Sequence, residues 1–162
     1  MPKRVLINTG LGLFLAALFS CSGEDNGAGS ASESITTNPT DASAGDVRWY
    51  EPEQVAAGRQ VFADNCAQCH GDAAQGLVED WRQRLDDGSF PPPPLNGSAH
   101  AWHHPLSVLL QVINEGGVPL GGQMPGFADQ LNEKEKLAAI AFFQNFWSDE
   151  IYASWQQMGG AN

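Results

Sequence analysis

The sequence predicts one all-α domain over residues 47–162, because three stretches combine helical periodicity with helix-start signals. Pro52 and Pro105 each stand where a run with apolar residues at helical spacing begins. Asn132, followed three residues later by Glu135, forms a capping-box pattern ahead of a third such run. The chain of 162 residues is long enough for one ordinary domain and an additional segment.

The composition excludes two classes of protein. Eight Lys and Arg face nineteen Asp and Glu, which gives a formal charge of −11. Nucleic-acid binding depends on clustered basic side chains, so this balance argues against it. Three cysteines are too few, and odd in number, for a scaffold held together by disulfides.

Residues 1–20 are predicted to be an export signal. Two basic residues precede the uncharged stretch Val5–Ser20, which is shorter than the roughly 20 residues of a membrane span. Leu18–Cys21 resembles the lipobox of bacterial lipoproteins, which implies that Cys21 is lipidated and becomes the new N-terminus. In that family Ser22 implies outer-membrane sorting in a Gram-negative cell. An ordinary secretory peptide is the alternative.

Residues 21–46 are predicted to be a lipid-anchored flexible tether. They are mostly Ser, Gly, Ala, Thr, Asn and Asp, which bury too little apolar surface to offset the entropy of ordering. A tether of this length reaches about 25–30 Å. A disordered tail without this role is the alternative. Removal of residues 1–20 leaves a charge of −13.

The chemistry is predicted to lie at Cys66–His70, which has the C-x-x-C-H pattern of c-type haem attachment. Residues three apart share one face of a helical turn, so the Cys66 and Cys69 thiols can bond the two vinyl groups of one haem. His70 then supplies the proximal iron ligand. The export signal favours this hypothesis, because haem is attached to c-type cytochromes outside the cytoplasm.

Two alternatives use the same cysteines. A free redox dithiol is one, although the following histidine is not typical of the thioredoxin context. A zinc site is the other, with two of three histidines as further ligands: His100, His103 and His104.

The first helix begins near Pro52 and places Val55, Gly58 and Phe62 on one face. Together with the haem motif this pattern resembles the single-haem class I cytochrome c family over residues 48–150. The resemblance implies a cytochrome c-like bundle of helices around one covalent haem c. It also implies that Gly58 and Phe62 lie where the first helix crosses the last, Glu133–Trp147, opposite Phe142.

The middle helix is predicted over Leu106–Glu115. Its four large apolar residues, at helical spacing, share one face, and Gly116-Gly117 stops it. The resemblance implies that the next loop supplies the sixth iron ligand, Met124. It also implies that the Pro93 carbonyl accepts the other N–H of His70 and that Leu95 lines the haem. A polyproline II ligand is the alternative for Pro91–Pro94.

Two further segments carry open alternatives. Three roles are open for the histidines His100, His103 and His104. They are a surface or packing role, the binding of a transition metal, and the replacement of Met124 as iron ligand. Beyond the usual family ending, Trp147, Ile151 and Trp155 recur every four residues. They are expected to continue a helical packing face, with a docking patch as the alternative.

The predicted function is one-electron transfer through a His/Met-ligated haem c, without enzymatic activity. Expected partners are redox proteins with basic docking patches, such as an oxidase or a reductase. The chain is expected on the periplasmic side of a bacterial envelope, anchored through Cys21. The alternatives are a haem peroxidase or gas sensor with a labile sixth ligand, and a metal-binding lipoprotein that uses the three histidines.

Overall fold

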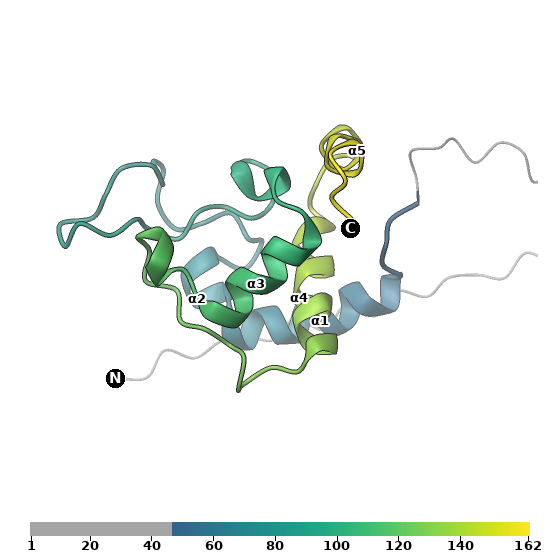
Figure 1. The fold of residues 1–162 in the computed structure, drawn as a ribbon, viewed down its shortest axis with the longest axis horizontal. Coiled ribbons are helices and arrows are strands. Elements are labelled where there is room, and N and C mark those ends of the chain that lie inside the picture. The colour runs from purple at the N-terminus through teal and green to yellow at the C-terminus, as the bar shows by residue number, and fades with distance from the viewer. Residues whose placement is uncertain (1–46) are drawn as a thin grey trace, which may run out of the picture. The chain divides into compact units, whose positions relative to one another are not determined.

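The computed structural model describes residues 47–162, and every regular element in this range is a helix (Figure 1). The all-α prediction is therefore confirmed. The α-helices are α1 (Pro52–Asn65), α2 (Ala67–His70), α3 (Leu106–Glu115), α4 (Glu133–Gln144) and α5 (Asp149–Gln157), and the 3-10 helices are η1 (His100–His103) and η2 (Val118–Leu120). None of these described helices has the length and hydropathy needed to span a membrane. The predicted signal, tether and lipidated Cys21 lie outside the described residues.

The fold is organised by the crossing of α1 and α4 (Figure 1). Gly58 is the point of closest approach, because a Cβ added there would fall on the backbone carbonyl of Ala138. Next to it the rings of Phe62 and Phe142 meet with their centroids 5.1 Å apart. The structure thus brings together the three residues that the family resemblance assigned to the helix crossing.

Helix α4 begins at the predicted capping box. The Asn132 side chain accepts from the backbone N–H of Glu135, and the Glu135 carboxylate accepts from the N–H of Asn132. From Ala138 to Gln144 every residue of α4 is buried. The second half of the helix is therefore covered on all sides, in contrast to a helix with one solvated face.

The last helix is shorter than the sequence predicts, since α4 ends at Gln144 and not at Trp147. Ser148 starts a separate helix by accepting a hydrogen bond from the N–H of Ile151, a common role for serine. Between the two helices the Trp147 indole donates to the Leu95 carbonyl at 2.8 Å. Trp147 and Trp155 are buried and Ile151 is partly buried against the core, so the three residues form the expected packing face, which weighs against the docking alternative.

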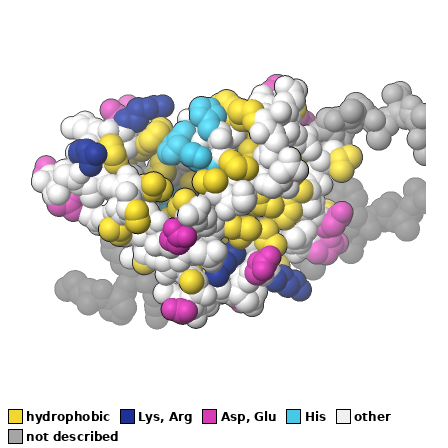
Figure 2. Space-filling model, viewed as in Figure 1, with side chains coloured by type: hydrophobic (Ala, Val, Ile, Leu, Met, Phe, Trp, Pro, Cys, Tyr) yellow, Lys and Arg dark blue, Asp and Glu magenta, His cyan; other side chains and the backbone are white. Residues whose placement is uncertain are grey.

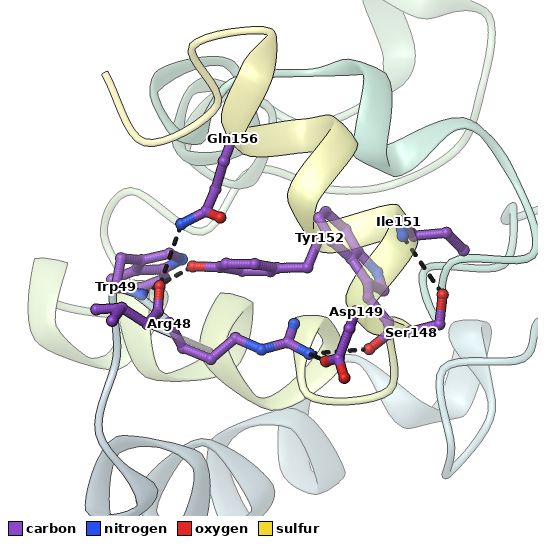
Figure 3. A network of polar contacts seen from close by, with 9 residues as sticks. Arg48, Trp49, Ser148, Asp149, Ile151, Tyr152 and Gln156 are labelled. Atoms are coloured by element: carbon purple, nitrogen blue, oxygen red, sulfur yellow. Dashed lines mark hydrogen bonds and ion pairs between the residues drawn. The ribbon is translucent and has the colours of Figure 1, made fainter. Parts of the chain in front are cut away.

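A hydrogen bond and an ion pair join helix α5 to the residues just before α1 (Figure 3). The Trp49 N–H donates to Tyr152 Oη at 2.8 Å, and the Trp49 indole donates to Gln144 Oε1 at 2.6 Å. Arg48 pairs with Asp149 at 2.7 Å. At the other side of α5, Trp155 Nε1 donates to the carbonyl of His104 at 2.8 Å. These bonds link the start of the domain through α5 to the segment ahead of α3.

Candidate cofactor site

The last four residues of the C-x-x-C-H motif form the single turn of α2, and Cys66 joins this turn to α1. The N–H of Cys66 still bonds to Phe62 of α1, and the N–H of His70 bonds back to the Cys66 carbonyl at 2.9 Å. Cys66 is half-buried, Cys69 is exposed, and both are free thiols. The motif is thus held on a rigid helical support, with both thiols available for covalent attachment.

His70 is buried, with 7% of its surface exposed, and its Nδ1 lies 2.9 Å from the Pro93 carbonyl oxygen. Burial lowers the pKa of His70, and the hydrogen bond to Pro93 opposes this shift in part. A neutral imidazole that donates from Nδ1 keeps a lone pair on Nε2. This is the state of a histidine ready to ligate a metal.

Backbone hydrogen bonds bring Pro93 to His70. The N–H groups of Leu95 and Asn96 donate to the Ala74 carbonyl at 2.7 and 3.1 Å, and the N–H of Gly76 donates to the His70 carbonyl at 2.7 Å. These bonds decide which of the four prolines lies next to His70, and that residue is Pro93. Ala74 carries no signal in the sequence that would have predicted this role.

The Cys66 thiol is unlike that of a redox dithiol. Burial raises the pKa of Cys66 to about 11, and the neighbouring Cys69 adds to the shift. Redox-active thiols have lowered pKa values that yield thiolate near neutral pH. A protonated, half-buried thiol therefore weighs against the redox-dithiol alternative.

Met124 lies in a loop that is pressed against the carboxyl end of α3. Gly117 N–H donates to the Met124 carbonyl at 2.9 Å, and Phe127 N–H donates to the Ile113 carbonyl at 2.8 Å. Gly116 has a φ of +85°, and a Cβ there would lie 2.5 Å from the Met124 carbonyl oxygen. Position 116 therefore requires glycine, which adopts a positive φ without strain and has no Cβ to collide with the Met124 carbonyl. Met158, the other methionine among the described residues, is exposed near the C-terminus.

Helix α3 matches its predicted bounds, yet none of its residues is buried. Its apolar face is only partly covered by the core, at four positions: Leu106, Leu109, Leu110 and Ile113. Leu95 and Trp102 are partly buried in the same way. A half-covered apolar wall, two thiols, a buried imidazole and a thioether are the donor set and surroundings that suit haem c.

His100 and His103 lie in η1, and His104 directly follows it. His100 stacks on Trp81 with ring centroids 4.7 Å apart, His103 packs on Trp102 at 3.9 Å, and His104 meets His100 edge-on at 5.4 Å. Within residues 47–162 no three His, Cys, Asp or Glu side chains are grouped so that they could hold a metal ion. The zinc alternative and the transition-metal alternative therefore gain no support. The stacking of Trp81 on His100 was not predicted, because 18 intervening residues separate them.

Comparison with known proteins places these features in a family. The family model described as cytochrome c oxidase, cbb3-type, subunit III matches residues 53–143. The cbb3-type cytochrome c oxidase subunit CcoP of Rhodobacter capsulatus is 54% identical over 35 residues, 22% of this chain and 12% of the relative. Subunit FixPc of Rhizobium leguminosarum bv. viciae is 59% identical over 29 residues, 18% of this chain and 10% of the relative.

The chain thus spans about a tenth of the length of the curated relatives that it matches. No solved structure matches significantly. The family match confirms the predicted cytochrome c fold, covalent haem c as cofactor, and electron transfer as the function of the domain. With more than half of its length matched, the chain belongs to the cytochrome c family of cbb3-type oxidase subunit III.

Proposed function

We propose that this chain is a membrane-anchored electron carrier with one haem c, attached through Cys66 and Cys69 and ligated by His70 and Met124. The observation that carries the ligand assignment is the His70 imidazole, buried and bonded through Nδ1 to Pro93, which leaves Nε2 as the metal ligand. When bound, haem c supplies one-electron Fe(III)/Fe(II) chemistry.

The chain's own residues hold and tune the cofactor. The Pro93 carbonyl fixes the ring orientation of His70 and raises its basicity as a ligand. The glycine contacts around Met124 hold its loop at the end of α3. A thioether ligand from Met124 in place of a second imidazole would raise the reduction potential of the bound haem c. Leu95 and the apolar face of α3 are partly buried against the core and would exclude water from the bound haem.

With both His70 and Met124 as ligands, the iron of the bound haem c would keep no position for a substrate, which favours outer-sphere electron transfer over catalysis. The relatives are named as subunits of a cbb3-type cytochrome c oxidase. We infer that this chain exchanges electrons with such an oxidase or with its reductant. An acidic chain of formal charge −11 would meet a partner with a basic docking patch.

The anchor and the location belong to the same proposal. The lipobox-like Leu18–Cys21, the charge-free stretch before it and the polar residues 21–46 support a lipidated N-terminus and a tether. The domain, residues 47–162, would then work at the periplasmic surface of a bacterial membrane. Mass spectrometry of the intact protein from a native-like host tests this part, because a diacylated Cys21 adds the mass of its lipid.

The ligand assignment is tested with Met124→Ala. In the ferric wild-type protein we expect a low-spin spectrum with the absorption of an Fe–S(Met) bond. Met124→Ala should abolish this absorption and let the iron bind an external ligand such as imidazole. Met158→Ala is the control, because Met158 is exposed, and it should leave the spectrum unchanged. A wild-type spectrum without the Fe–S(Met) absorption, or one that Met124→Ala leaves unchanged, would contradict the assignment.

A further inference from the structure

The chain between α2 and η1, residues 71–99, forms a long loop without a helix of its own. Loops longer than about 12–15 residues that lack secondary structure are uncommon in compact domains, and they usually have a function. In Figure 1 this loop is the teal trace at the left of the molecule. The candidate cofactor site uses the two ends of the loop, near Ala74 and Pro93, and leaves its middle, residues 77–90, without a role.

The tip of this loop, residues 84–90, is held in shape by its own side chains. The Asp87 carboxylate accepts from the N–H of Ser89 at 2.9 Å and from its hydroxyl at 2.6 Å. The Arg84 guanidinium lies over the Phe90 ring, 3.9 Å from the ring centroid. The tip is therefore a preformed turn that can support a neighbouring segment.

A side-chain contact joins the tip to the residue next to Met124. The amide Nε2 of Gln123 donates to Ser89 Oγ at 2.9 Å and also to the Asp87 carboxylate. The hydrogen bonds from Ser89, and to a smaller extent the one from Gln123, lower the pKa of Asp87. The carboxylate is therefore charged at neutral pH, and a charged acceptor forms a stronger hydrogen bond than a neutral one.

A backbone contact joins the tip to the same loop. The N–H of Phe90 donates to the Gly121 carbonyl at 2.8 Å, and a Cβ added at Gly121 would lie 3.5 Å from the Phe90 ring. From the other side, the N–H of Gly122 donates at 3.0 Å to the carbonyl of Gly117, which follows α3. The residues ahead of Met124 are thus held between the end of α3 and the tip.

We propose that Gln123, held by Asp87 and Ser89, positions Met124 as the sixth ligand of the haem iron. This inference rests on the proposed function, because it needs Met124 on the iron. A loop that is fixed on both sides gains little conformational entropy when its ligand leaves the metal, whereas a loop released on one side gains more. Loss of the Gln123 contact should therefore favour the state in which Met124 has left the iron and an external ligand has replaced it.

The test is a titration of the ferric holoprotein with imidazole, which competes with Met124 for the iron. We expect imidazole to bind to Gln123→Ala about threefold to tenfold more tightly than to the wild type, the range of a single net hydrogen bond. Asp87→Ala should give a similar increase, and the double variant should exceed neither single variant by much, because both substitutions remove the same contact. Wild-type affinity in Gln123→Ala would overturn the proposal.

The control must remove a charge without removing the contact. Figure 2 shows basic and acidic side chains intermixed at the left end of the molecule, so the loss of any one charge changes the local field. Asp86→Ala is the matched control, since Asp86 is exposed directly beside Asp87. We expect it to bind imidazole like the wild type. An increase in Asp86→Ala equal to that in Asp87→Ala would overturn the proposal.

A reversal of donor and acceptor separates positioning from general damage to the fold. Gln123→Glu sets a second carboxylate against Asp87, and the repulsion should raise the imidazole affinity further than Gln123→Ala does. Adding Asp87→Asn restores a donor and an acceptor in exchanged places, so the double variant should return toward the wild-type affinity. A double variant that binds imidazole as tightly as Gln123→Glu would overturn the proposal.

The Fe–S(Met) absorption distinguishes a failure of this inference from a failure of the proposed function. A wild-type protein without this absorption would contradict the ligand assignment, and this inference with it. A wild-type protein that has the absorption, with the same imidazole affinity in the wild type and Gln123→Ala, would contradict the positioning role alone.

Discussion

Helices α3 and α4 are of similar length and have opposite surroundings. Of the twelve residues of α4, eight are buried, whereas none of the ten residues of α3 is buried. The sequence makes α3 the more regular amphipathic helix, since its apolar residues Leu106, Leu109, Leu110 and Ile113 fall on one face. Amphipathicity therefore does not predict which of the two helices the protein itself covers.

The difference lies in what each helix packs against. Helix α4 packs on α1 through Gly58 and Phe62, and Gln144 at its end accepts from Trp49. These are contacts between protein groups. The apolar face of helix α3 is covered only in part by protein groups, and we propose that haem c covers the rest of it. In this proposal one half of the core is built by the chain alone and the other half is completed by the cofactor.

The largest expected loss of stability comes from a substitution at Gly58, where α1 and α4 form the part of the core that the chain builds alone. In Gly58→Val the new side chain would collide with the Ala138 carbonyl, so α1 and α4 must move apart. We expect a loss of about 3 kcal/mol or more in the free energy of unfolding, at the upper end for overpacking. Urea denaturation followed by circular dichroism measures it.

Ala57→Val is the control for Gly58→Val, because Ala57 is exposed on the same helix. The Ala57→Val variant introduces the same β-branched side chain without the collision, so its free energy of unfolding should fall by well under about 1 kcal/mol. Equal losses in the two variants would show that Gly58 is not a point of close approach.

A smaller effect is expected where α5 joins α4 and the start of the domain. Tyr152 is fully buried, and its Oη accepts from the Trp49 N–H (Figure 3). Tyr152→Phe removes this acceptor and leaves the N–H of Trp49 unpaired, which should cost about 1–2 kcal/mol. Urea denaturation measures the loss, and Gln157→Ala, exposed on the same helix, serves as control. A loss no larger than that of the control would mean that this bond adds nothing to stability.

Local signals allowed much of the fold to be predicted. Pro52, Pro105 and the Asn132 capping box lie within a residue of the observed helix starts, and Gly116 marks the end of α3. The assignment of Pro93 also needed only the Pro-x-Leu pattern of the family, and the structure has the Pro93 carbonyl in contact with His70. Each of these signals acts over a few residues or belongs to one motif.

What the sequence did not predict depends on contacts between distant residues. The predicted end of α4 was wrong because Trp147 leaves the helix and its indole donates to the Leu95 carbonyl, 52 positions away. The bond from Trp49 to Gln144 spans 95 positions and has no local pattern. The burial of His100 Nδ1 likewise depends on packing around η1, including the ring of Trp81.

The contrast between α3 and α4 is tested most directly by amide hydrogen exchange, comparing the holoprotein with a Cys66→Ala/Cys69→Ala variant that cannot attach haem. Exchange reports the stability of each helix separately. We expect α3 to be protected in the holoprotein and to lose most of its protection in the variant, with a smaller loss in α4. Equal protection of α3 in the two proteins would contradict the central claim that haem c completes the core over this helix.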